Sequence, residues 1–361
     1  MLSTTLTALI LISTSILSTS AVNTSFKLIE NLQGYNLTQA FNWETGGGWD
    51  NGGIPLYVNQ VTARRYGLWT VKSPVATGQN VFRVDGKANV PGPYRMSTRI
   101  STKKNYNGGG LFVFDVAHIP VGYGLWPALW MVGLPEWPNQ GEIDVIEGVH
   151  VTTKNTQSFH TGYNCSMQKT GFTNSFTLHS DLQTNCSALA TENQGCSTRD
   201  GSTKSYGAPF NAQGGGVFVV KWDFNGIALY SYPRNSIPSD FLAGSPDPEG
   251  TNWGTPTALV SNQNCSIFDN FNEMKIVLNS NLCGSWPGGV WNDDLSYVGS
   301  PGSPANKTRT KTCEEYVLRG GYNALKEAYW TINSIKIYNE TVDWQVVPST
   351  VATTNLARRE L

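Results

Sequence analysis

Apolar and polar positions alternate with a period of two residues in many segments of the chain, which is the pattern of strands in a half-buried sheet. Helical periodicity is confined to Cys313–Trp330 (CEEYVLRGGYNALKEAYW), where Gly320–Gly321 interrupts it. The alternating segments predict strands at 81–86, 94–102, 110–120, 125–133, 156–162, 273–280 and 329–339. The pattern therefore predicts an all-β fold.

Turn and loop signals separate these strands. The clearest hairpin is VFVVKWDFNGIALYSY, in which Asn225–Gly226 favours a type I′ turn because both central residues of that turn adopt positive φ. Gly-, Ser- and Asn-rich segments at 44–54, 186–216 and 284–306 predict loops that could carry a binding site. No linker or repeat divides the chain, so we expect one sandwich domain over 22–345 and a loose tail over 346–361.

One strand, in NQGEIDVIEGVH, carries three carboxylates. In a regular strand Glu142 and Asp144 share one face, but Glu147 lies an odd number of positions later and would turn into the core. An unpaired carboxylate there is costly. A β-bulge near Val145–Ile146 would return Glu147 to the face of the other two acids, and bulges recur beside active sites.

Three acids on one face suit a retaining glycosidase, which needs two carboxyls about 5–5.5 Å apart. One Glu would attack the anomeric carbon and the other would protonate the leaving oxygen, while Asp144 between them keeps their pKa values apart. The alternative is an acidic face exposed to solvent. The odd step to Glu147 and the flanking Trp126, Trp130 and Trp137 favour the glycosidase interpretation.

Composition narrows the classes of partner. Only 14% of the 361 residues are charged and the net charge is −1, so neither a nucleic acid nor a membrane surface is expected as partner. The 12 Trp, 15 Tyr and 14 Phe are compatible with stacking on sugar rings, and also with a β-core that needs large side chains.

The beginning of the chain, MLSTTLTALILISTSILSTSAVNTS, reads as a secretory signal over residues 1–21, cut near Ser20 or Ala21. The alternative is a membrane anchor, but the apolar run is short and interrupted by Ser and Thr. The charged end NLARREL argues against a lipid-anchor signal. We therefore expect a secreted or cell-wall protein.

Cysteines and sequons point to the same compartment. The six cysteines allow up to three disulfides; free core thiols are the alternative, and the absence of a C-x-x-C pair disfavours zinc. Seven N-x-S/T sequons predict a glycoprotein. The cysteines are Cys165, Cys186, Cys196, Cys265, Cys283 and Cys313, and the sequons begin at Asn23, Asn36, Asn164, Asn185, Asn264, Asn306 and Asn339.

The segment WPALWMVGLPEWPNQGEIDVIEGVH resembles glycoside hydrolase family 16, in particular its fungal laminarinase-like endo-β-1,3(4)-glucanases. These carry W-P-A-x-W and then W-P-x-x-G-E-[IV]-D-[IV]-[IV]-E-G. The bulged E-x-D-x-x-E form is typical of this branch, and the unbulged E-x-D-x-E form is typical of bacterial lichenases and xyloglucan transglycosylases. FDVAHIPVGYG and FHTGYNC extend the resemblance. His150 and CGSWPGG (283–289) depart from the family's usual Asn and C-G-D-W-A-G.

The resemblance implies a jelly-roll, concanavalin-like sandwich of two curved antiparallel sheets with a glucan-binding cleft on its concave face. It implies Glu142 as nucleophile, Glu147 as acid/base and Asp144 as assistant, and a Cys283–Cys313 disulfide. The positions that match the family's cleft are Tyr57, Asn59, Arg99, Trp126, Trp130, Trp137, His160 and Trp253.

Several of these residues have a second interpretation from the residues alone. Trp126 or Trp130 could pack in the core, His160 could be a half-buried histidine with satisfied hydrogen bonds, and Arg99 could pair with an acid. Trp222 and Trp330 lie in strongly alternating strands and are predicted to be core residues.

The function predicted at this point is endo-acting hydrolysis of β-1,3-glucans and mixed β-1,3/1,4-glucans by a monomer whose partner is the polysaccharide. No cofactor is required and no metal site is predicted, although a structural calcium ion on the convex face stays open. Two alternatives on the same scaffold are a non-catalytic glucan-binding protein and a cell-wall transglycosylase. Both catalytic glutamates are present, which disfavours the first of these.

Overall fold

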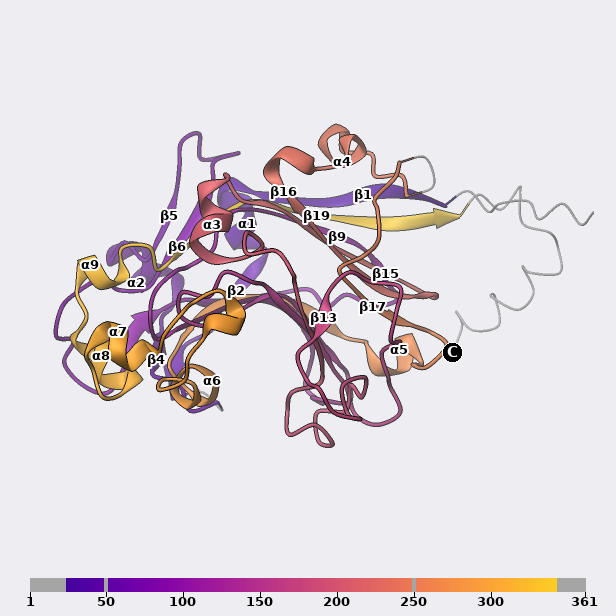
Figure 1. Ribbon diagram of the computed structural model, residues 1–361. Helices are drawn as coiled ribbons and strands as arrows, with labels where there is room; N and C mark the ends of the chain where they lie inside the picture. The colour runs from indigo at the N-terminus through magenta and orange to yellow at the C-terminus, as the bar shows by residue number, and fades with distance from the viewer. Residues whose placement is uncertain (1–23, 49–50, 249–250, 343–361) are drawn as a thin grey trace, which may run out of the picture. The chain divides into compact units, whose positions relative to one another are not determined.

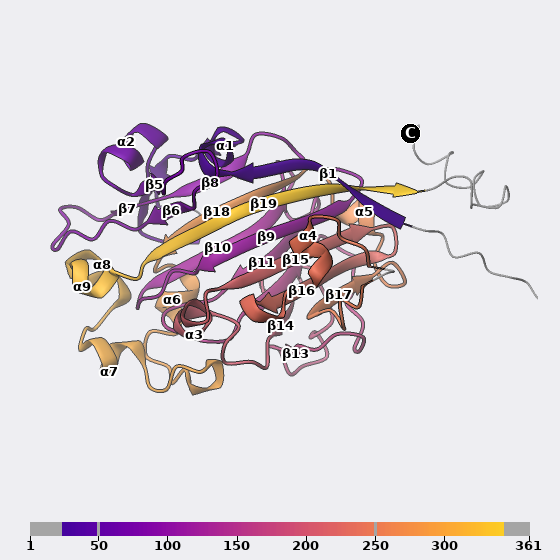
Figure 2. The same cartoon turned by 90° about the horizontal axis from the view of Figure 1, so that it is seen from above.

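Two antiparallel sheets of eight strands each lie face to face, as Figures 1 and 2 show. The computed structural model describes residues 24–48, 51–248 and 251–342, and Phe26–Glu340 form the unit discussed here. The predicted signal peptide (1–21) and tail (346–361) lie outside the described residues. Over the described ranges, no helix is long and apolar enough to cross a membrane. The all-β prediction is confirmed.

The first sheet is called the β9 sheet. It pairs its strands in the order β17 (Ala258–Ser261), β16 (Gly226–Pro233), β15 (Gly216–Asp223), β9 (Gly110–His118), β19 (Tyr329–Val342), β6 (Asn80–Arg83) and β5 (Trp69–Val71), with β1 (Thr24–Gln33) also paired to β19.

The second sheet is called the β11 sheet. Its order is β13 (Ser175–Phe176), β14 (Cys196–Arg199), β12 (Thr156–His160), β11 (Glu142–Glu147), β10 (Leu125–Gly133), β18 (Met274–Leu282), β8 (Arg99–Thr102) and β2 (Phe41–Trp43). A small third sheet joins β3 (Gly46–Gly47), β4 (Pro55–Tyr57) and β7 (Arg95–Ser97).

Short helices fill the connections between strands. They are α1 (Gly34–Gln39), α2 (Gln60–Arg65), α3 (Gly207–Ala212), η1 (Arg234–Ser236), α4 (Ser239–Ala243), α5 (Ile267–Asn270), α6 (Ser285–Gly289), η2 (Ser296–Val298), α7 (Pro304–Thr308), α8 (Cys313–Arg319) and α9 (Tyr322–Leu325). The helical pattern at 313–330 is confirmed as α8 and α9, and Thr312 caps α8 by accepting a hydrogen bond from the Glu315 N–H.

Predicted and observed elements differ in several places; the predicted loop at 284–306, for example, contains α6, η2 and the start of α7. The predicted strand at 94–102 is divided, because β7 pairs in the small sheet while β8 pairs with β18 in the β11 sheet. The predicted loop at 186–216 contains β14 and α3. β14 is only four residues long and rich in Ser and Thr, so its alternation was too short to be recognised.

The predicted type I′ turn at Asn225–Gly226 is wrong. Asp223 pairs with Gly226, so the two residues between the strands are Phe224 and Asn225. The Asp223 carboxylate accepts hydrogen bonds from the N–H groups of Asn225 (2.8 Å) and Gly226 (3.2 Å). This side-chain turn fixes the connection one residue earlier than the Asn-Gly pair predicts.

The main hydrophobic core lies between the two large sheets. Alternate residues of β9, such as Phe112 and Phe114, face alternate residues of the β11 sheet, such as Met131 and Ile143, and all four are fully buried. Trp222 and Trp330 belong to this cluster, as predicted. Burial of one face of each sheet leaves the other face of the β11 sheet available for polar side chains.

All six cysteines form disulfides: Cys165–Cys265, Cys186–Cys196 and Cys283–Cys313. The pairing implied for Cys283 and Cys313 is confirmed. The Cys165–Cys265 bond joins segments that lie 100 residues apart in the chain. The Cys186–Cys196 bond ties a loop to the first residue of β14.

Arg95 is completely buried and joins distant segments of the chain. Its Nε donates to the Val317 carbonyl (2.6 Å), and its two terminal nitrogens donate to the carbonyls of Asp85, Lys87, Leu318 and Gly320. The guanidinium thus binds the segment after β6 to the end of α8. A planar group with five donors is suited to this arrangement.

Candidate active site

The predicted bulge is present in β11. Asp144 pairs with Ser158 and Glu147 pairs with Thr156, so three steps on β11 match two steps on β12. Val145 and Ile146 are both fully buried in the core, and the three acids therefore lie on the face away from the core. The odd step from Asp144 to Glu147 therefore has the predicted structural cause, a bulge in the strand.

The side chain of Asn155 supports the bulge. Its Nδ2 donates to the Val145 carbonyl (2.9 Å) and its Oδ1 accepts from the Glu147 N–H (3.0 Å). Gln157 donates to the same carbonyl (3.2 Å). These bonds replace the strand pairing that the extra residue interrupts, so the backbone of Glu147 is held at a fixed position.

Each of the three acids has one donor from a ring nitrogen. Trp137 Nε1 donates to Glu142 Oε2 (2.6 Å), and Trp126 Nε1 donates to Glu147 Oε1 (2.7 Å). His160 Nε2 lies 3.1 Å from Asp144 Oδ2. The structure therefore brings three of the predicted site residues, Trp126, Trp137 and His160, to the acids, and His160 is buried beside Asp144.

Burial and mutual repulsion change the protonation of the two glutamates. Their side chains are only half-exposed, and burial, followed by the charge of Asp144, raises the pKa of both Glu142 and Glu147 well above the ordinary carboxyl range. The indole donors oppose this shift because they stabilise the ionised form. Two carboxyls with raised pKa values near one anionic neighbour can hold a proton at neutral pH.

His160 carries the compensating charge. Burial alone would lower its pKa, but the hydrogen bond to Asp144 and the nearby charges of Glu142, Asp144 and Glu147 raise the pKa of His160 to about 9. The imidazole is therefore protonated at neutral pH and donates from Nε2 to Asp144. One cation thus balances part of the negative charge of the three acids.

The same residues include the one group of potential metal ligands found over the described ranges. Ligand atoms of Glu142, Asp144 and His160 lie within 4.8 Å of one another. The donor set would require His160 to be neutral, whereas its surroundings favour the imidazolium. The arrangement is explained by proton chemistry, and no step is assigned to a metal.

A second group of residues lies on neighbouring strands of the same face. Arg99 on β8 lies over the ring of Trp130 on β10, with 5.1 Å between its Cζ and the ring centroid. Trp130 Nε1 donates to Asn279 Oδ1 (2.8 Å), and Asn279 Nδ2 lies 3.4 Å from the Tyr57 hydroxyl. Burial raises the pKa of Tyr57 to about 12, so its hydroxyl stays neutral.

These contacts determine what each residue can offer a ligand. Trp130 is half-exposed and lies beside Asp144 in the strand pairing, so it borders the acids rather than packing in the core. Tyr57 is only 2% exposed, and its hydroxyl contacts the side chains of Asn279 and Arg99. Tyr57 therefore supports the polar side chains of the site and exposes little surface to a ligand.

The segment that departs from the family's usual sequence also reaches the site. Trp286 on α6 packs edge-on against Trp126, with 5.8 Å between ring centroids. His150 Nδ1 accepts from the Gly124 N–H (3.0 Å), and His150 Nε2 donates to the Pro287 carbonyl (3.1 Å). Burial lowers the pKa of His150 to about 4, so this neutral ring links the end of β11 to α6.

Two predicted site residues have other contacts. Trp253 packs on the outer face of the β9 sheet, 4.6 Å from the ring of Phe241 between centroids, and donates to Asp240 (2.7 Å). The prediction that Trp253 lines the cleft is therefore wrong. Asn59 is exposed and caps α2 by accepting from the Thr62 N–H (2.9 Å), and among the described residues no hydrogen bond is found between Asn59 and the three acids.

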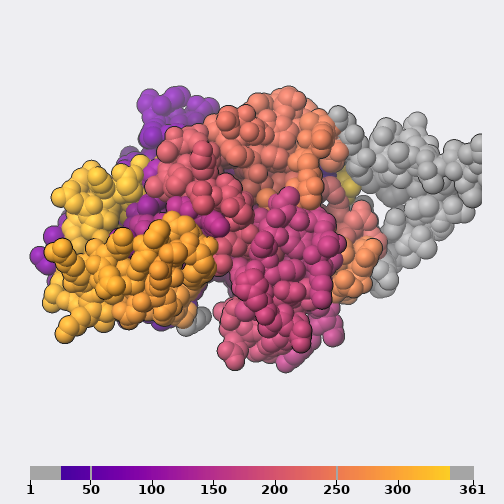
Figure 3. Space-filling model, in the orientation of Figure 1, coloured from indigo at the N-terminus to yellow at the C-terminus, as the bar shows by residue number. Residues whose placement is uncertain are grey.

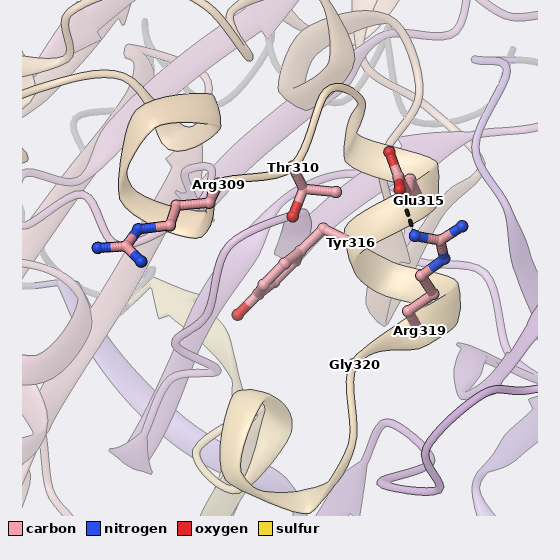
Figure 4. A pocket seen from close by; sticks show the side chains of 6 residues that line it. All are labelled: Arg309, Thr310, Glu315, Tyr316, Arg319 and Gly320. Carbon is pink, nitrogen blue, oxygen red and sulfur yellow. Dashed lines mark hydrogen bonds and ion pairs between the residues drawn. The ribbon is translucent and has the colours of Figure 1, made fainter.

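The open face of the β11 sheet is bordered by two lobes. Figure 3 shows a notch between the orange segment around residues 284–320 and the magenta segment around 160–200. A separate pocket of about 240 Å³ lies against α8 and is drawn in Figure 4. It contains Tyr316 and the Glu315–Arg319 ion pair but none of the acids of β11, so we assign the chemistry to the open face.

Comparison with known proteins agrees with this geometry. The model of the XgeA-like catalytic domain of glycoside hydrolase family 16 matches residues 41–338. The chain belongs to this family. A solved structure of laminarinase 16A from Phanerochaete chrysosporium, with β-glucans in donor and acceptor sites, superposes with a TM-score of 0.76 and 33% identity over 87% of this chain and 100% of that chain.

Among curated family 16 relatives, a probable endo-1,3(4)-beta-glucanase of Aspergillus clavatus is 37% identical over 95% of this chain and 52% of its own length. The endo-1,3(4)-beta-glucanase XgeA of Emericella nidulans is 35% identical over 87% of this chain and 47% of its own. The chain thus spans about half the length of these relatives. The jelly-roll sandwich implied by the sequence is confirmed by the fold of the family's laminarinases.

Proposed function

We propose that this protein is an endo-acting, retaining β-glucanase that hydrolyses β-1,3-glucans and mixed β-1,3/1,4-glucans. The observation that carries the proposal is the bulge in β11, which places Glu142, Asp144 and Glu147 on one open face beside indole rings. Family membership and relatives named endo-1,3(4)-beta-glucanase support the substrate class.

In the first step the Glu142 carboxylate attacks the anomeric carbon, and a glycosyl-enzyme ester forms as the glycosidic C–O bond breaks. Glu147 gives its proton to the leaving oxygen, and its raised pKa keeps that proton available at neutral pH. In the second step Glu147 removes a proton from water, the water oxygen attacks the anomeric carbon, and Glu142 leaves as a carboxylate.

Asp144 and His160 assist without bonding to the sugar. Asp144 lies between the glutamates in the strand, and its charge raises the pKa of both. The imidazolium of His160 holds the Asp144 carboxylate by a hydrogen bond and limits the accumulated negative charge. Trp126, Trp130 and Trp137 supply half-exposed or exposed indole faces for the apolar faces of glucosyl units.

Product analysis on laminarin, lichenan and xyloglucan tests the proposal. We expect oligosaccharides of mixed length from laminarin and from lichenan, with the β-anomer formed first when the reaction is followed by proton NMR. Cleavage of xyloglucan with none of laminarin would exclude the proposed substrate class. Initial formation of the α-anomer would exclude the retaining mechanism.

Two alternatives keep the same scaffold. The solved structure of an elongating family 16 β-1,3-glucosyltransferase superposes with a TM-score of 0.75 and 31% identity, so transfer to a sugar is a specific second candidate. Products longer than the starting oligosaccharide at low substrate concentration would favour it. Binding of laminarin without any cleavage by the wild-type protein would favour a non-catalytic glucan-binding protein.

We also propose that the protein is a secreted, N-glycosylated monomer. Three disulfides are compatible with an oxidising compartment, and the sequon residues Asn36, Asn164, Asn264, Asn306 and Asn339 are exposed. Mass spectrometry of the secreted protein without reduction should give a chain starting near residue 22, glycans at exposed sequons and no free thiol. Two or more alkylated cysteines would contradict this proposal.

A further inference from the structure

Arg199 on β14 lies on the same open face as the acids, two strands away from Glu147. Glu147 pairs with Thr156 on β12, and Thr156 pairs with Arg199. Residues that pair directly across antiparallel strands share a face, and neighbouring strands lie about 4.7–4.9 Å apart. The backbone of Arg199 is therefore roughly 10 Å from that of Glu147 across the sheet.

One donor of the Arg199 guanidinium is left without a partner by the residues that the structure describes. Its Nε is buried without a hydrogen-bond partner among the residues that the structure describes, and no ion pair involving Arg199 is found over the same ranges. Its contact is with the ring of Tyr297, 5.1 Å from Cζ to the ring centroid. A guanidinium has five donors, and leaving buried donors unpaired is costly, so this group is suited to a ligand with several oxygen acceptors.

Tyr297 comes from the opposite wall, in η2, and is held there by its loop. The Asp294 carboxylate accepts from the N–H groups of Ser296 (2.8 Å) and Gly302 (3.0 Å), and the Thr153 N–H donates to the Val298 carbonyl (3.0 Å). The ring is nevertheless 54% exposed. An aromatic ring that is fixed in place and still exposed presents a ready surface for stacking.

We propose that Arg199 and Tyr297 form a sugar-binding subsite for a glucosyl unit of a long β-glucan chain, beyond the units that contact the acids. This inference rests on the proposed function. The apolar face of the pyranose stacks on Tyr297, and its hydroxyl oxygens accept hydrogen bonds from Arg199. The subsite joins the β11 sheet to the 290–303 loop, and it should make the enzyme favour substrates long enough to reach these two residues.

The dependence of rate on substrate length tests the subsite. In the double variant Arg199→Ala/Tyr297→Ala, we expect kcat/KM for laminariheptaose to fall about tenfold while that for laminaritetraose changes by less than about twofold. Tyr297→Phe keeps the ring and should retain most of the activity on laminariheptaose. Arg83→Ala is the matched control, because Arg83 makes the same kind of contact with Tyr329 on the β9 sheet, with Cζ 4.1 Å from the ring centroid.

A binding measurement separates recognition from folding. In the inactive background Glu142→Gln, calorimetric titration with laminariheptaose should show about tenfold weaker binding once Arg199 and Tyr297 are replaced, at an unchanged melting temperature. An equal loss for both oligosaccharides, or no loss for either, overturns the subsite. Failure of the wild-type protein to cleave laminarin would instead refute the proposed function, so the two failures are distinguishable.

Discussion

At the scale of single residues, the proposed mechanism gives Glu142 and Glu147 different roles: Glu142 attacks as a carboxylate, and Glu147 donates and then accepts a proton. Glu142→Gln should abolish turnover of every substrate, because no glycosyl-enzyme can form. Glu147→Ala should still react with an aryl β-glucoside whose leaving group is acidic, and then stall because water lacks a base. Azide needs no base and should release the stalled intermediate as a β-glycosyl azide, which can be identified by NMR.

The opposite result has a clear meaning. If azide restores the Glu142 variant as an α-glycosyl azide and leaves the Glu147 variant inactive, the two roles are exchanged. Wild-type protein with azide serves as the control for direct reaction of the substrate. Asp144→Asn should have intermediate activity, because it changes the protonation of its neighbours without removing a reacting group.

The two indole donors predict shifts in the pH profile. Trp126 stabilises ionised Glu147, so Trp126→Phe should raise the pKa of Glu147 and move the alkaline limb of kcat/KM upward, by about half a unit to one unit. Trp137 stabilises ionised Glu142, so Trp137→Phe should move the acid limb upward. Profiles measured on an aryl glycoside and on laminarin check both directions. A downward shift of either limb would contradict the assigned roles.

At the scale of secondary structure, the bulge depends on Asn155. Asn155→Ala removes the donor to the Val145 carbonyl and the acceptor for the Glu147 N–H, and should lower the free energy of unfolding by about 1–3 kcal/mol. Activity should fall further than stability alone explains, because Glu147 loses its fixed position. Gln157→Ala is the matched control, since Gln157 bonds the same carbonyl but leaves the Glu147 N–H paired.

Denaturant unfolding and kcat/KM, measured on both variants, test this. Equal losses of activity in the two variants would show that Asn155 acts only through stability.

The bulge in the acidic strand could be predicted because alternation determines which face a strand residue occupies. Regular alternation would have placed the Glu147 carboxylate in the core. The contact between Trp130 and Asn279 could not be predicted in the same way, because it depends on the pairing of β10 with β18. Trp253 could not be placed, because its neighbours Asp240 and Phe241 come from α4, and this helix packs against the outer face of the β9 sheet. Asn155 and Arg199 lie in short or irregular segments that have no period to read.

At the scale of the whole molecule, Arg95 connects segments that are more than two hundred residues apart in the chain. Arg95→Lys keeps the charge but loses the planar fork, so several buried carbonyls lose their donors. We expect the free energy of unfolding to fall by about 3 kcal/mol, as measured by urea unfolding. The exposed Arg64→Lys on α2 is the control and should change stability by less than about 0.5 kcal/mol. A similarly small change in the free energy of unfolding for Arg95→Lys would show that water replaces the lost hydrogen bonds.

The extra residue in β11 also bears on how the gene can change. In most strand positions, the loss of one codon would reverse the face of every later side chain. In β11, loss of the codon for Val145 or Ile146 would remove the bulge and still leave the three acids on the open face, now as E-x-D-x-E. Loss of the codon for Ile143 would instead separate them. A single in-frame deletion at this point is therefore a mutational route between the bulged and unbulged forms that keeps the carboxylates of Glu142 and Glu147 out of the core.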